Sequence, residues 1–173
     1  MSLLKTSKRD ISKIMGVPRV GLMAAGAAFA ADRFIKWWML EIFDMPSRGQ
    51  VALTPFFDLV VVWNKGVSFG LFNSGGQEKR WILTAISIVI VSVLFFWLRQ
   101  TTDRLSAVAF GLIIGGAIAN IYDRFSFGAV ADFFDFHIGG YHWPAFNLAD
   151  SAITIGVVLI LVQAIADRRK LDQ

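Results

Sequence analysis

A short pattern, an asparagine three residues before an aspartate, occurs twice where an apolar stretch meets a polar one. The first copy is "NIYD" (120–123) and the second is "NLAD" (147–150). Residues three apart lie on the same face of a helix, so each amide is expected to orient its carboxylate by hydrogen bonding. Two carboxylates held close together share a proton, and one can activate water while the other acts as an acid. The pattern predicts a pair of catalytic acids, Asp123 and Asp150.

Helix capping is the main structural alternative for these side chains. Asn147 or Asp150 can cap a helix N-terminus, a role that contributes about 0.5–2 kcal/mol. Asp123 is expected at a helix C-terminus, where a carboxylate opposes the helix dipole, so capping does not explain it. Arg124 can either pair with Asp123 or extend to the membrane surface. Two acids in the same local context favour a shared function.

Other chemistries find less support in the residue types. The chain has no cysteine, which excludes disulfides and thiolate catalysis. Its two histidines, His137 and His142, are too few to favour a zinc site, and Ser68 and Ser151 lack a base nearby in the sequence. We expect no metal or other cofactor, although four carboxylates remain candidate ligands for a hard cation such as Mg²⁺: Asp123, Asp132, Asp135 and Asp150.

The elements that must position these acids are membrane helices. The chain has 173 residues and is 55% hydrophobic but only 17% charged, against roughly 25% charged residues in soluble domains. A membrane-spanning helix needs about 20 mostly apolar residues. Four segments qualify, the first of them interrupted by charges: about 20–40, 81–98, 105–122 and 149–166. We therefore expect residues 1–173 to form a single membrane-embedded domain.

The distribution of basic residues predicts the orientation. Lys and Arg gather in the first twenty residues, in the link between the second and third segments, and in the C-terminal tail. Such clusters normally face the cytoplasm, so both termini are expected there. Segments 41–80 and 123–148 then face outward, which places Asp123 and Asp150 at one depth near the outer surface. The net charge of +4 is thereby explained by membrane orientation, without nucleic acid.

The outer segments carry signals for a small sheet. Residues 48–72 contain β-branched and aromatic runs such as "FFDLVVVWN", which predict strands. Gly75 and Gly76 predict a turn before the second span. Tryptophans near the span ends fit an aromatic belt at the membrane surface: Trp37, Trp38, Trp81, Trp97 and Trp143.

Five sequence blocks, in this order and on four spans, resemble the lipoprotein signal peptidase (signal peptidase II) family. They are "DRFIK" (32–36), "NKGVSFG" (64–70), "GGAIANIYDRF" (115–125), "VADFFDF" (130–136) and "PAFNLADSAI" (144–153). The resemblance covers nearly the whole chain. It departs at Ala119, where glycine is usual, and at Val67 and Ser68, where alanines are common. These departures are small in volume and affect local packing.

The resemblance implies the fold class of an all-α membrane protein, with four transmembrane helices, a small β-rich extracytoplasmic cradle and a short extracytoplasmic helix. It implies an aspartic endopeptidase that removes the signal peptide of bacterial prolipoproteins, on the N-terminal side of a diacylglyceryl-modified cysteine. The catalytic residues it implies are Asp123 and Asp150. The positions that match supporting residues are Asn64, Gly66, Asn120, Arg124, Asn147 and Ala149, with Asp32 and Lys36 in structural or supporting roles.

The resemblance also implies partners and a location. Diacylglyceryl-modified prolipoproteins and membrane phospholipid are the expected partners, and cyclic peptides of the globomycin type are expected inhibitors. The expected location is the bacterial cytoplasmic (inner) membrane, with the active site near its outer, periplasmic surface.

Three other functions make different predictions. A proton-coupled transporter would carry charges deep within several spans, and only Asp32 is a candidate here. A lipid-modifying transferase using Mg²⁺ would be stopped by EDTA. A non-enzymatic assembly factor would tolerate substitution of both acids.

Overall fold

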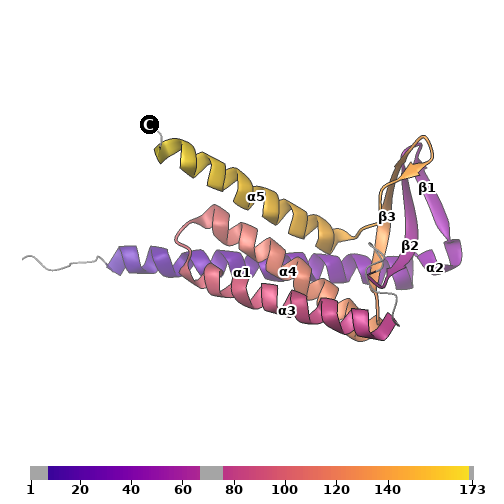
Figure 1. The fold of residues 1–173 in the computed structure, drawn as a ribbon, viewed down its shortest axis with the longest axis horizontal. Helices are drawn as coiled ribbons and strands as arrows, with labels where there is room; N and C mark the ends of the chain where they lie inside the picture. The colour runs from indigo at the N-terminus through magenta and orange to yellow at the C-terminus, as the bar shows by residue number, and fades with distance from the viewer. Residues whose placement is uncertain (1–7, 67–75, 172–173) are drawn as a thin grey trace, which may run out of the picture.

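The computed structural model describes residues 8–66 and 76–171. Four long helices form a bundle: α1 (Lys8–Trp37), α3 (Gly76–Gln100), α4 (Arg104–Phe127) and α5 (Leu148–Leu171). Helix α1 continues into a π-helical turn, η1 (Trp38–Ile42), and a four-residue helix, α2 (Met45–Arg48), follows. The resemblance predicts a short helix without giving its residues, and α2 is a short helix within segment 41–80. Figure 1 shows the sheet at one end of the bundle, with the start of α1 and the end of α5 at the other.

Three helices in the described part of the chain are long and apolar enough to cross a membrane. They cover Glu78–Gln100, Arg104–Phe127 and Leu148–Arg168, and they match three of the predicted spans. Large apolar side chains such as Val89 and Leu161 are more than half exposed on α3 and α5, as expected for surfaces that face lipid. The fold is thus that of a mostly helical membrane protein. Helix α1 occupies the first predicted span but is not in this set.

Helix α4 is the centre of the bundle, because it packs against α1, α3 and α5. Glycines allow the close approach of these helices. A Cβ at Gly116 would lie 2.5 Å from the carbonyl oxygen of Ala149 in α5, and a Cβ at Gly115 would overlap the carbonyl oxygen of Ala25 in α1. The first turn of α5 is therefore seated directly on the backbone of α4.

The small sheet has four antiparallel strands in the order β1-β2-β3-β4. Strands β1 (Gln50–Thr54) and β2 (Phe57–Asn64) lie within the predicted strand region. No strand is predicted in segment 123–148, but β3 (Val130–Ile138) and β4 (Tyr141–His142) lie there. Of the predicted turn residues, Gly75 lies outside the described residues and Gly76 begins α3.

A compact apolar cluster attaches the sheet to the bundle. It is formed by Met39 of η1, Met45 of α2, and Ala131 and Phe133 of β3, all nearly fully buried. Because only two residues separate the end of α4 at Phe127 from the start of β3 at Val130, this cluster fixes the first residues of β3 near the C-terminal ends of α1 and α4.

Candidate active site

Asp123 lies inside α4, because the helix continues past the predicted end at Tyr122 to Phe127. Its side chain is fully buried. Lys36 Nζ lies 2.6 Å from Asp123 Oδ2, and Arg33 Nη2 lies 2.6 Å from Asp123 Oδ1. The backbone N–H of Ala131 also donates to Asp123 Oδ2, at 3.2 Å. Both oxygens of this carboxylate are therefore in contact with cations or with backbone.

Asp32 and Lys36 extend this buried ionic group across α1. Lys36 Nζ lies 2.9 Å from Asp32 Oδ2, one helical turn away. Asp32 Oδ1 accepts the backbone N–H of Ala149, in the first turn of α5, at 3.0 Å. Asp32 therefore pairs with Lys36, as a structural role predicts, and also satisfies one of the free N–H groups at the start of α5.

Asp150 and Asn147 form a reciprocal cap at the start of α5. Asn147 Oδ1 accepts the N–H of Asp150 at 2.9 Å, and Asp150 Oδ2 accepts the N–H of Asn147 at 3.2 Å. This is the geometry of a capping box. Asn120 Nδ2 donates to the other oxygen, Asp150 Oδ1, at 2.8 Å. Asn120 therefore orients Asp150 of the neighbouring helix, whereas the sequence pattern pairs it with Asp123.

A third carboxylate, Asp132 of β3, enters this network. From the sequence, Asp132 is predicted only as a candidate metal ligand. Asn147 Nδ2 donates to Asp132 Oδ1 at 2.7 Å, and Asn64 Nδ2 donates to Asp132 Oδ2 at 3.1 Å. Burial, reinforced by the nearby Asp150 carboxylate, raises the pKa of Asp132 to about 7, although the two amides oppose the shift. This carboxyl group is thus able to hold a proton near neutral pH.

One continuous path of hydrogen bonds joins Asp132 to Asp150. It runs from Asp132 to Asn147, from Asn147 Nδ2 to Asn120 Oδ1 at 3.2 Å, and from Asn120 to Asp150. Both predicted asparagines are therefore shared between the two acids. The signal in the sequence was the "VADFFDF" block (130–136), which contains Asp132 and belongs to the resemblance, although Asp132 was not among the predicted site residues.

The remaining predicted residues lie around this path. Asn64 Oδ1 accepts the N–H of Gly66 at 2.8 Å, and Gly66 has a positive φ of 81° that favours glycine. Arg124 is half-buried and donates through Nη1 to the carbonyl oxygen of Asn120 at 3.3 Å. Ala149 is fully buried. Of these residues, Arg124 contacts the backbone of a path residue, Asn120.

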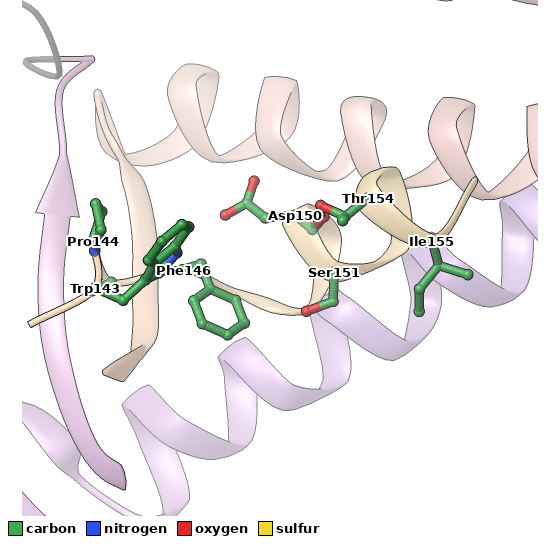
Figure 2. Close-up of a pocket in the computed structure, with 8 residues that line it drawn as sticks. Trp143, Pro144, Phe146, Asp150, Ser151, Thr154 and Ile155 are labelled. Atoms are coloured by element: carbon green, nitrogen blue, oxygen red, sulfur yellow. Dashed lines mark hydrogen bonds between the residues drawn. The ribbon is translucent and has the colours of Figure 1, made fainter. Parts of the chain in front are cut away.

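Two recesses open on either side of the segment Pro144–Ala145, and each contains one of the two acids. The larger, of about 520 Å³, contains Asp150 and is otherwise mostly apolar. Figure 2 shows its lining residues, which belong to segment 143–146 and to the first turns of α5. The smaller, of about 430 Å³, contains Asp132 together with Asn64 and Lys65. Asp123 lines neither recess.

The alternative chemistries can be placed on the same geometry. The Ser151 hydroxyl donates to the carbonyl oxygen of Asn147 at 3.1 Å, and Ser68 lies outside the described residues. Of the four candidate metal ligands, Asp135 contacts His142 at 2.8 Å and Asp123 contacts Lys36 and Arg33. Within residues 8–66 and 76–171, no three His, Asp or Glu side chains are grouped so as to hold a metal ion.

Comparison with known proteins places this site in a family. The family model described as signal peptidase (SPase) II matches residues 24–166. The chain belongs to the signal peptidase II family. It is therefore a membrane peptidase, a hydrolase of peptide bonds. The match covers all five sequence blocks, from "DRFIK" (32–36) to "PAFNLADSAI" (144–153).

Relatives agree along most of the chain. A lipoprotein signal peptidase of Beijerinckia indica is 45% identical over 148 residues, which are 85% of this chain and 89% of the relative. Another, of Nitrobacter hamburgensis, is 47% identical over 147 residues, 83% of this chain and 90% of the relative. A solved bacterial membrane enzyme superposes with a TM-score of 0.73 at 29% identity, covering 85% of this chain and 93% of the other.

Proposed function

We propose that this signal peptidase is an aspartyl endopeptidase that removes the signal peptide from bacterial prolipoproteins, and that Asp132 and Asp150 are its two catalytic acids. The cut lies on the N-terminal side of the diacylglyceryl-modified cysteine. The observation that carries the assignment is the hydrogen-bonded path Asp132–Asn147–Asn120–Asp150, with each acid lining a recess large enough for part of a substrate.

The surroundings of Asp123 favour a supporting role. Its oxygens contact Lys36, Arg33 and the N–H of Ala131, and Asp123 lines neither of the two recesses in which a substrate could bind. Removing one partner of a buried ion pair strongly destabilises a protein, because the other charge is left unpaired. Substitution of Asp123 would therefore lower the activity even though Asp123 takes no direct part in the reaction. The assignment of Asp123 and Asp150 made from the sequence stays a prediction.

The two acids divide the chemistry between them. Asp150 takes a proton from a water molecule, whose oxygen attacks the carbonyl carbon of the scissile peptide bond. Asp132, protonated near neutral pH because of its raised pKa, donates its proton to the carbonyl oxygen. Collapse of the tetrahedral intermediate breaks the C–N bond: the proton held by Asp150 passes to the leaving amine, and one hydroxyl group of the intermediate returns a proton to Asp132 as it becomes the carbonyl of the product. Asn120 and Asn147 keep the two carboxyl groups in the same relative orientation during these steps.

The recesses suit a substrate with one apolar and one polar part. The larger recess, walled by Trp143, Phe146 and Ile155, accepts apolar groups, and the smaller one with Asn64 and Lys65 accepts extended peptide. Membrane phospholipid covers the exposed apolar faces of α3 and α5. A cyclic peptide of the globomycin type would compete for the same recesses.

The topology follows from α1. Its 30 residues extend about 45 Å at 1.5 Å per residue, enough to be the fourth span beside α4. Both termini are then cytoplasmic, and the sheet and the site lie at the outer surface of the bacterial inner membrane. The basic residues of the N-terminus, of the α3–α4 link and of the C-terminal tail support this orientation.

A cleavage assay tests the proposal. The purified protein in lipid is given a diacylglyceryl-modified prolipoprotein, the unmodified precursor, or the modified substrate with EDTA. We expect cleavage of the modified substrate only, no effect of EDTA, and no cleavage by Asp150→Asn or Asp132→Asn. Loss of activity with EDTA would favour the metal-dependent alternative, and cleavage by the Asp150 variant would exclude the aspartyl mechanism.

A further inference from the structure

We propose that Lys36 is a positioning residue that sets the distance between the two catalytic acids. This inference rests on the proposed function, because it concerns the spacing of Asp132 and Asp150. The buried ammonium group of Lys36 fixes the position of strand β3, which carries Asp132, relative to helix α5, which carries Asp150.

The residue that precedes each acid is anchored in the same way. Ala131, just before Asp132, donates its backbone N–H to Asp123 Oδ2 at 3.2 Å. Ala149, just before Asp150, donates its backbone N–H to Asp32 Oδ1 at 3.0 Å. Both alanines are fully buried. Each acid is therefore attached through one peptide unit to a buried carboxylate that takes no part in the chemistry.

Lys36 joins these two anchors. Its Nζ lies 2.6 Å from Asp123 Oδ2 and 2.9 Å from Asp32 Oδ2, and its side chain is 2% exposed. An ammonium group has three donors and no acceptor, so it can bind both carboxylates at once. The path Asp132–Ala131–Asp123–Lys36–Asp32–Ala149–Asp150 crosses from the sheet to α5 by way of α4 and α1.

The charges around Lys36 fit this role. Arg33 Nη2 lies 2.6 Å from Asp123 and 3.3 Å from Asp32, so two cations face two carboxylates. Asp32, Lys36 and Asp123 are buried, and the equal number of positive and negative charges keeps the group neutral where a lone charge would be costly. A network that only stapled α1 to α4 would require Asp123 and Lys36 alone. The further bonds to Ala131 and Ala149 link it to both acids, and a displacement of about 1 Å in such a site can cost on the order of 10²-fold in rate.

The test compares Lys36→Met with the double variant Asp32→Asn/Lys36→Met. The double variant removes one positive and one negative charge, which leaves the Arg33–Asp123 pair balanced and guards against misfolding. We expect a fall in kcat of about 10²-fold with KM changed less than about threefold. The Lys36 charge itself lowers the pKa of Asp132, so its loss alone moves that limb of the pH–rate profile to higher pH. Because the separation of the acids sets how far their titrations are split, the positioning role predicts in addition that the interval between the two limbs becomes narrower. Lys36→Arg, which keeps the charge, should restore part of the rate.

Gln163→Leu is the matched control. Gln163 links α5 to the start of α4 at the opposite end of the bundle, through Ser106 at 2.9 Å and Asp103 at 2.6 Å. The Gln163→Leu variant should have a lower thermal stability, while kcat and both limbs of the pH–rate profile stay as in the wild type. Lys36 variants that are folded and have unchanged kcat and limbs would overturn the positioning role, while inactive Asp132 and Asp150 variants would leave the proposed function intact. A fall in rate that only matches the fall in the folded fraction, with both limbs of the pH–rate profile unchanged, would also overturn the positioning role.

Discussion

The two proposed catalytic acids differ in their immediate surroundings. Asp150 belongs to the capping box that begins α5 and accepts one further amide, from Asn120. Asp132 lies in a buried strand and accepts only the side-chain amides of Asn64 and Asn147. Burial is the main reason that the pKa of Asp132 rises from 3.8 to about 7. When the surroundings of two carboxyl groups in one site separate their pKa values, the group with the higher pKa is assigned as the acid and the other as the base.

The pH dependence of cleavage follows from this difference. Asp132 must carry a proton to act as the acid, so kcat/KM should fall as the pH rises through about 7. The same raised pKa means that the folded chain binds this proton more tightly than the unfolded chain. Its contribution to stability is complete below about 4 and is lost as the pH rises through about 7. Initial rates and thermal unfolding between pH 5 and pH 9 measure both. Activity that increases steadily up to pH 9 would contradict the role of Asp132 as the acid.

Asn147 combines a structural and a functional contact that one substitution separates. Serine is about as good an N-cap as asparagine, so Asn147→Ser should keep α5 intact and change the melting temperature little. It removes the Nδ2 group that donates to Asp132 Oδ1 and Asn120 Oδ1. We expect cleavage to fall by about 10²-fold, an effect typical for loss of precise orientation. Wild-type activity in a folded Asn147→Ser protein would show that the path between the acids is dispensable.

At the scale of elements, the long apolar runs sufficed to predict α3, α4 and α5, whereas their ends were less predictable. Helix α4 continues five residues beyond Tyr122 because its aromatic residues find partners that the sequence does not reveal. The rings of Phe125 and Trp81 lie 5.3 Å apart, and those of Phe127 and Trp63 lie 5.5 Å apart. Gly128, with a φ of 78°, then ends the helix.

Strand β3 was not predicted because its burial lacks the alternation of an ordinary surface strand. Its first four residues, Val130–Phe133, are all buried, since one face meets the bundle and the other meets the site. Its pairing with β2 joins residues about 70 positions apart, such as Asp132 and Val62. Local patterns contain no information on such a contact, which explains why Asp132 was not paired with Asp150 from the sequence.

The contact between α4 and α5 gives a prediction for Gly116. A methyl group there would lie 2.5 Å from the carbonyl oxygen of Ala149 and 2.9 Å from the Ile153 side chain, so Gly116→Ala must move the first turn of α5. We expect a loss of about 1–3 kcal/mol in unfolding free energy and a large fall in cleavage, because Asp150 moves with that turn.

Gly26→Ala is the control for this substitution. Gly26 also lies in a bundle helix, but a Cβ there has no neighbour within 4 Å, so stability and activity should stay close to wild type. If both alanine variants behaved alike, the close approach of α4 and α5 would not be what positions Asp150.

At the scale of the whole molecule, the site lies where two structural systems meet. The helical bundle supplies Asn120 and Asp150, and the sheet at its end supplies Asn64 and Asp132 (Figure 1). The relative position of the bundle and the sheet is fixed by the apolar cluster under β3 and by the buried ionic group around Lys36.

The most direct test of this account compares Asp132→Asn with Asp123→Asn in single-turnover cleavage of a diacylglyceryl-modified prolipoprotein, using folded protein in lipid. Asn at position 123 can still accept the N–H of Ala131, so we expect measurable cleavage, reduced about 10- to 100-fold through loss of positioning. Asp132→Asn should give no cleavage above background, because the acid itself is gone. Retained activity in the Asp132 variant together with complete loss in the Asp123 variant would contradict the account and establish Asp123 as the partner of Asp150.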